Sequence, residues 1–104
     1  MTRAEAAVQK SELVLLTDGV AVAPLHVMLS LKGTLPTPCY YLRAKINEPD
    51  KDKRIQVEVY SLYNPDEICI QVLQQFDTFI PLGSYPAGTY TVWLNGNKIG
   101  DFTQ

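Results

Sequence analysis

The sequence predicts an all-β fold, an antiparallel sandwich of about seven or eight strands held by one disulfide. Three features point to it. Apolar and polar residues alternate with a period of two over most of the chain, and turn-forming residues interrupt the alternation at regular intervals. The two cysteines, Cys39 and Cys69, each open an alternating segment.

The alternating segments are expected to be strands that turn one face toward the core. There are five of them, over residues 27–31, 40–46, 55–59, 68–72 and 90–94. The apolar run at residues 13–16 is expected to be a strand buried on both sides, continued by residues 20–22 after the turn at Asp18-Gly19. Residues 1–11 have no clear apolar stripe and are expected to be a flexible arm or linker, which leaves residues 12–104 as the sandwich domain.

Turn residues separate the strands. They stand at Pro36-Thr37-Pro38, Pro49-Asp50-Lys51-Asp52, Asn64-Pro65-Asp66, Pro86-Ala87-Gly88 and Asn95-Gly96-Asn97. The last of these is a strong hairpin signal, because Asn-Gly adopts the turn that matches the twist of two paired strands. Tyr90, which follows Gly88-Thr89, fits the position of a tyrosine corner that bonds back to the preceding loop.

The placement of Cys39 and Cys69 predicts a disulfide that ties two strands. A loop of this length would stabilise the fold by about 3–4 kcal/mol in the chain-entropy model. A bridge also favours an oxidising compartment, so the protein is expected to be extracellular or in the cell envelope. Two free thiols in a cytosolic protein are the alternative. Strand parity places both sulfur atoms away from the apolar face, at a strand start or on an outer face.

Composition excludes several function classes. The 104 residues suit one domain. A net charge of −2 provides no basic surface for nucleic acid, and no apolar stretch is long enough to cross a bilayer. Residues 1–10 do not form a signal peptide, so an exported form would have lost its leader. No nucleic-acid partner and no membrane insertion by this chain are expected.

His26, the sole histidine, would have to be the base of any Ser-His-Asp or Cys-His arrangement. It lies on the outward parity of its strand, and the chain has no nucleophile elbow. If Cys39 and Cys69 are bridged, neither thiol can act as a nucleophile. We therefore expect a surface histidine, no catalytic residues and no enzyme.

Carboxylates gather at Glu48, Asp50 and Asp52, and again at Asp66 and Glu67. The first group offers oxygen atoms to calcium, but it lacks the glycine and the distal glutamate of a calcium loop. We expect a solvated hairpin loop there and a turn at the second group. No metal and no cofactor are expected.

Tyr41, Tyr60 and Trp93 share the outward parity of their strands. If the sandwich leaves that face open, the three rings would form an aromatic patch of the kind that binds proteins or sugars. This predicts a partner-binding face for an unknown protein or carbohydrate, on a monomer or weak dimer. The alternative is that the second sheet or the amino-terminal residues cover the rings.

Several segments follow one another in a recognisable order. They are residues 12–16, Gly33-Thr34-Leu35-Pro36 before Cys39, Asp66-Glu67-Ile68-Cys69, Phe76, Ile80-Pro81-Leu82 and residues 86–92. In this order they resemble bacterial immunoglobulin-like domains of exported proteins and lipoproteins. The resemblance implies an immunoglobulin-like antiparallel β-sandwich, secreted or envelope-anchored, in which Cys39 and Cys69 pair. That group has no assigned activity, so it supplies no functional residues, and this chain carries neither its leader nor its lipobox cysteine.

The first functional hypothesis is a non-catalytic secreted or envelope-associated module for adhesion or partner binding. The alternative is a proteinase inhibitor that inserts an exposed loop, residues 35–38 or 64–67, into a protease cleft. A small hydrolase ranks third, because a base, a nucleophile and an oxyanion site are not evident.

Overall fold

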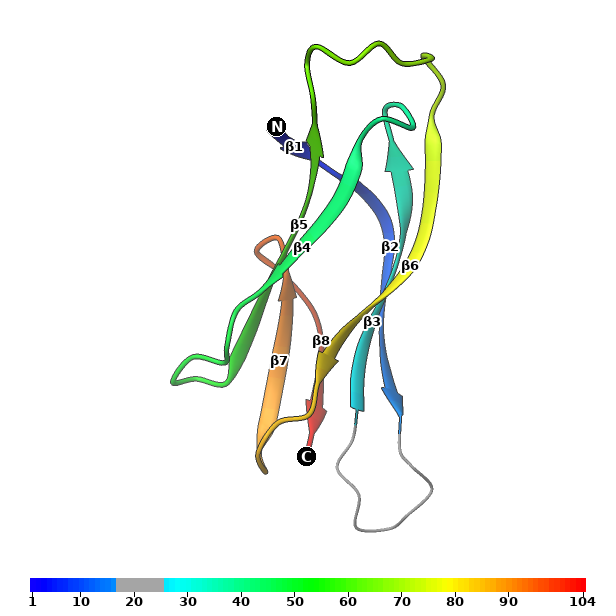
Figure 1. The fold of residues 1–104 in the computed structure, drawn as a ribbon. Helices are drawn as coiled ribbons and strands as arrows, with labels where there is room; N and C mark the ends of the chain where they lie inside the picture. Colours follow the sequence, from blue (N-terminus) through cyan, green and yellow to red (C-terminus); the bar gives the residue numbers. More distant parts are fainter. Residues whose placement is uncertain (17–25) are drawn as a thin grey trace.

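A computed structural model describes residues 1–16 and 26–104, which form eight β-strands in two sheets (Figure 1). The strands are β1 (Thr2–Glu5), β2 (Ala7–Leu16), β3 (His26–Leu35), β4 (Tyr41–Ile46), β5 (Arg54–Tyr63), β6 (Gln74–Gly83), β7 (Thr89–Leu94) and β8 (Asn97–Thr103). The predicted all-β sandwich is confirmed. The predicted turn at Asp18-Gly19 and the strand at residues 20–22 lie outside the described residues.

Sheet B consists of β2, β3 and β6, with β3 in the middle, and sheet A consists of the other five strands. In sheet A, β5 is central. Val57 pairs with Ile46 of β4 on one edge and with Leu94 of β7 on the other, and Leu62 likewise pairs with β4 and with β1. Strands β1 and β7 therefore lie along the same edge of β5, β7 beside residues 54–57 and β1 beside residues 60–63.

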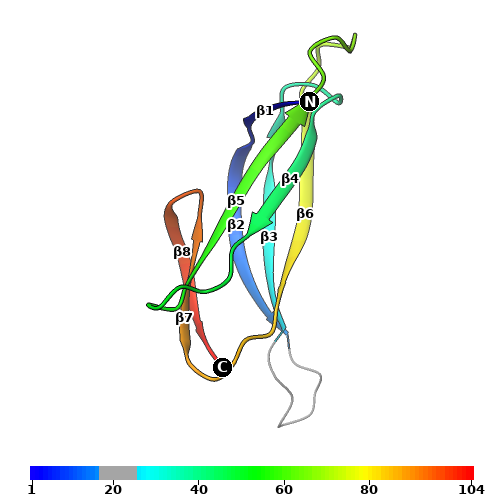
Figure 2. The same ribbon diagram turned by 60° about the vertical axis from the view of Figure 1, so that its left-hand side comes forward.

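Of the six strand pairs formed by the described residues, five are antiparallel, as predicted, but β5 and β7 run parallel. The chain leaves β5, crosses to sheet B as β6, and returns as β7 (Figure 2). A parallel pair needs such a long crossover, and here the second sheet supplies it. The molecule measures 51 × 30 × 19 Å, so the sandwich is elongated along its strands.

The core lies between the sheets and comes from β3, β5, β7 and β8. Its buried members are Val27, Leu29, Leu31, Ile55, Val57, Val59, Tyr90, Val92, Leu94 and Phe102. The alternation predicted for residues 27–31, 55–59 and 90–94 is confirmed. The Tyr90 hydroxyl donates a 2.8 Å hydrogen bond to the Pro86 carbonyl, so the predicted tyrosine corner is also confirmed.

Three predicted core segments differ. Ile68, Ile70 and Val72 belong to no strand and are exposed. Leu15 is exposed because β2 is an edge strand of sheet B, and the expectation of burial on both sides was wrong there. Ala44 and Ile46, which share the parity expected for the core, are exposed on the edge strand β4. The core alternation predicted for residues 40–46 therefore fails at the end of that segment.

Residues 1–11, expected as an arm, instead form β1 and the first half of β2. Thr2–Glu5 pairs with β5, and the buried Ser61 hydroxyl donates a 3.1 Å hydrogen bond to the Glu5 carbonyl. Backbone pairing of this kind needs no apolar stripe, which explains why the sequence pattern did not reveal it.

Asn95 completes the ladder of β5 between β7 and β1. Its side-chain Oδ1 accepts the Val59 N–H at 2.9 Å, and its Nδ2 donates to the Val59 carbonyl at 3.2 Å. Asn95 and Gly96 both have positive φ angles, 48° and 86°, which is the geometry of the predicted Asn-Gly hairpin. One residue therefore makes the β7–β8 turn and fills the gap between two strands.

Candidate binding face

The outer face of sheet A carries the aromatic residues that the sequence singled out. Residues directly opposite each other on paired strands point to the same side of a sheet. Tyr60 lies opposite Arg43, and Leu62 lies opposite both Tyr41 and Arg3. These five residues therefore share the outer face, and we call them the tyrosine cluster.

Two arginines accompany the rings of this cluster. The Arg3 guanidinium carbon lies 4.0 Å from the centroid of the Tyr60 ring, and that of Arg43 lies 5.8 Å from the Tyr41 ring. Each exposed cation–π contact contributes about 0.5–1 kcal/mol. Arg3 also approaches Glu58 at 3.8 Å. The contacts orient the rings while the guanidinium groups stay accessible to a partner.

A groove borders the cluster in the gap along β5 where the pairings with β1 and with β7 both end. Its volume is about 510 Å³, and its lining residues are Arg3, Ala4, Glu5, Ala6, Val59, Tyr60 and Asn95. The groove combines an aromatic ring, an arginine, a carboxylate and a side-chain amide. It is open to solvent.

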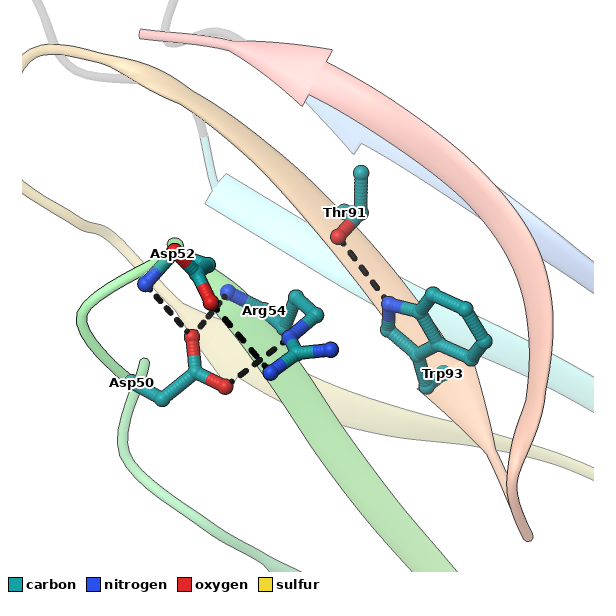
Figure 3. A network of polar contacts seen from close by, with 5 residues as sticks. All are labelled: Asp50, Asp52, Arg54, Thr91 and Trp93. Atoms are coloured by element: carbon teal, nitrogen blue, oxygen red, sulfur yellow. Dashed lines mark hydrogen bonds and ion pairs between the residues drawn. The ribbon is translucent and has the colours of Figure 1, made fainter.

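Trp93 lies on the same face but at a distance from the tyrosines. It pairs in register with Gln56, four residues along β5 from Tyr60, which is a separation of about 13 Å along the strand. Its indole Nε1 donates a 3.0 Å hydrogen bond to Thr91 Oγ1 (Figure 3). The structure thus brings Tyr41 and Tyr60 together and leaves Trp93 as a separate, half-buried neighbour on the same face.

Two of the three carboxylates considered for calcium, Asp50 and Asp52, bind an arginine instead. Asp50 Oδ2 accepts Arg54 Nε at 3.0 Å, and Asp52 Oδ2 accepts Arg54 Nη2 at 3.3 Å (Figure 3). Asp50 Oδ1 also accepts the backbone N–H groups of Asp52 and Arg54, which closes the β4–β5 turn. Among the described residues, no three His, Cys, Asp or Glu side chains lie close enough to hold a metal ion.

The pKa of Asp50 is lowered from its ordinary 3.8, first by the hydrogen bond from the Arg54 backbone and further by Asp52 and the guanidinium. A lowered folded-state pKa stabilises the fold above the unfolded pKa, and this contribution is lost as the pH falls through the folded value. We therefore expect wild type to lose more stability than Asp50→Asn between about pH 4 and pH 2, measured by urea unfolding. Parallel pH curves for the two proteins would contradict this role.

The two loops considered for protease inhibition lie at one end of the sandwich and are joined covalently. Cys39 follows the first loop and Cys69 the second, and the two form the predicted disulfide with a Cα separation of 6.1 Å. The Tyr40 and Tyr63 rings stack there with centroids 4.8 Å apart. The free-thiol alternative is excluded, and a disulfide is typical of proteins from oxidising compartments.

His26 lies at the opposite end, exposed at the start of β3. Ser84 Oγ is 3.4 Å from its Nδ1 atom. Its exposure agrees with the outward position that its parity predicts.

Over the part of the chain that the structure describes, no helix is long and apolar enough to span a membrane.

Comparison with known families matches residues 29–104 to the ORF11 beta-sandwich domain. The chain belongs to this family. No curated protein and no solved structure matches the chain. The ORF11 match confirms the β-sandwich that the resemblance implied. It includes both cysteines and all three aromatic residues of the predicted face.

Arg3 and Arg43 belong to the cluster but were not predicted as site residues. Arg43 shares the parity of Tyr41, so its position was available from the alternation. Arg3 lies outside the ORF11 match, in a segment whose strand was not recognised. Only the pairing of β1 with β5 brings it to Tyr60.

Proposed function

We propose that this ORF11 beta-sandwich is a non-catalytic module of a secreted or envelope-associated protein, and that it binds a partner protein through the outer face of sheet A. The observation that carries the proposal is the tyrosine cluster with its adjoining groove. Tyrosine, tryptophan and arginine are the residues most enriched in the energetic centres of protein interfaces. Here two tyrosines and two arginines meet on one open face, and Trp93 lies farther along the same face.

The geometry favours a protein over a small ligand. Small-molecule sites are enclosed and bury most of their ligand, whereas this face is broad and its groove is open. Tyrosine rings present a large contact area at low cost in side-chain entropy, and arginines pair with carboxylates on the partner. A carbohydrate, which also stacks on tyrosine rings, is the competing occupant.

The disulfide supports the proposed location. Bridges persist in oxidising surroundings and are rare in the cytosol. We therefore propose that this face takes part in adhesion or partner binding outside the cell.

We expect Tyr41→Ala and Tyr60→Ala each to weaken partner binding by about 30-fold or more, since the centres of interfaces contribute at least 2 kcal/mol per residue. Wild type, both variants and Phe79→Ala would be screened against arrays of extracellular proteins and of glycans. Phe79 is a matched control, because it is 55% exposed but lies on β6 of the other sheet.

The proposal requires a protein whose binding depends on Tyr41 and Tyr60 and not on Phe79. Binding that appears only on the glycan array would replace the partner protein with a carbohydrate. If every interaction survives both tyrosine substitutions, the outer face of sheet A is not the binding site. Thermal unfolding of each variant shows that a loss of binding is not a loss of fold.

A further inference from the structure

The segment between β5 and β6 carries several of the most exposed large apolar side chains among the described residues. Ile68 is 98% exposed, Ile70 67% and Val72 51%. We call residues 68–72 the apolar segment. It crosses one end of the sandwich in an extended path (Figure 1), and Cys69 fastens it to Cys39.

The backbone of this segment makes few hydrogen bonds: the Cys69 carbonyl accepts one from the Gln71 side-chain Nε2 at 3.2 Å. Among the described residues, no backbone-to-backbone hydrogen bond involves residues 68–73. The segment is nevertheless rich in β-branched residues and alternates with a period of two, which is the pattern of a strand. The segment therefore has the composition of a β-strand but no adjacent strand to which its backbone is hydrogen-bonded.

The sheet edges of the same molecule are built differently. Edge strands usually carry charges or proline that discourage pairing with other chains. Lys10 and Glu12 stand on β2, Arg43 and Lys45 on β4, Asp77 and Pro81 on β6, and Lys98 and Asp101 on β8. Residues 68–76 carry no charge at all. Of these extended segments, the apolar segment alone is left unprotected.

We propose that the apolar segment pairs antiparallel with the same segment of a second copy of this chain, centred on Ile70. In this register Ile70 faces Ile70, and Ile68 faces Val72 in both directions. Every β-branched side chain then meets another across the pair, which is the stabilising arrangement for cross-strand neighbours. The pattern is its own complement under a two-fold axis.

Charge selects this orientation. Antiparallel pairing places Asp66 opposite Gln74 and Glu67 opposite Leu73, so no two carboxylates face each other. A parallel arrangement would oppose Asp66 with Asp66 and Glu67 with Glu67, which is destabilising.

A lipid surface fits less well. It would cover the apolar side chains but leave the backbone groups without hydrogen-bond partners. The adjoining acidic residues, Asp66 and Glu67, would also be repelled by anionic headgroups. A second strand satisfies the side chains and the backbone together.

The test is sedimentation equilibrium of wild type, Ile70→Lys and Ile70→Glu, alone and mixed. The short interface is below the standard size, so a weak dimer is expected, detectable at protein concentrations up to about 1 mM. Each substitution alone should weaken self-association about tenfold or more, because it opposes like charges. Mixing the two variants should restore a one-to-one dimer, because lysine then faces glutamate.

Phe79→Lys is the matched control, since Phe79 is 55% exposed outside the segment, and this variant should dimerise as wild type does. Ile70 is exposed, so its variants should keep the wild-type thermal unfolding. Wild type that stays monomeric near 1 mM, a Phe79→Lys variant that dissociates, or a mixture that fails to associate would each overturn the proposal. The proposal is independent of the outer face of sheet A, because Tyr41 and Tyr60 lie outside the apolar segment, and Tyr41→Ala and Tyr60→Ala are expected to leave this dimer unchanged.

Discussion

Replacing both Cys39 and Cys69 by serine is expected to lower the free energy of unfolding by about 3–4 kcal/mol in the chain-entropy model. The bridge joins positions 30 residues apart and so restricts a large part of the unfolded chain. Urea unfolding of wild type and of the double variant measures the difference. Reductant should shift the wild-type midpoint to that of the variant and leave the variant unchanged.

The same change should act locally on the β5–β6 connection. Residues 68–73 have no backbone-to-backbone hydrogen bonds within the described part of the chain, so the disulfide at Cys69 is their principal tie. We expect limited proteolysis to cut this connection first in the double-serine variant. A double variant as stable and as resistant to protease as wild type would show that the bridge adds no constraint.

Leu29→Ala is expected to cost about 2–5 kcal/mol, the range for a large-to-small change in a close-packed core. Leu29 is 0% exposed and belongs to the buried cluster that also contains Ile55 of β5 and Val92 of β7, which are paired on neighbouring strands of the opposite sheet. Truncation removes packed methyl groups and leaves a cavity that the two sheets cannot close without moving.

Met28→Ala is the matched control for this substitution. Met28 is the neighbouring residue of β3, is only half-buried and points to the opposite face. Its truncation should cost clearly less, as measured by urea unfolding. Equal losses at the two positions would mean that the core does not lie between the sheets as described.

The strands were predictable where alternation and burial coincide. At residues 27–31, 55–59 and 90–94 the apolar side faces the other sheet, so a period of two gave the correct core. The Asn95-Gly96 hairpin and the Tyr90 corner were predictable for a different reason. Their geometry depends on a few adjacent residues, which the sequence shows directly.

The same alternation misled at residues 68–72. A period of two predicts that Ile68, Ile70 and Val72 share a side of the chain, but it does not predict whether that side faces the core or solvent. Only the three-dimensional arrangement shows that it faces solvent. Leu15 failed similarly, because a short apolar run does not show whether its strand is central or at an edge.

The candidate face was predicted in part. Parity placed Tyr41, Tyr60 and Trp93 on one outer face, and the structure agrees on their side of the sheet. Parity carries no information on distance, so it did not separate Trp93 from the other two rings. Arg3 could not be predicted from the sequence, because its place beside Tyr60 depends on the long-range pairing of β1 with β5.

The parallel pairing of β5 with β7 has a consequence for how the chain is made. As residues leave the ribosome in order, β5 can form its hairpin with β4 at once, but the edge at residues 54–57 must wait for residues 91–94. Until then that edge is open to any other nascent or unfolded chain. We expect the last dozen or so residues to complete the molecule late, because pairing over a long stretch of chain is slow.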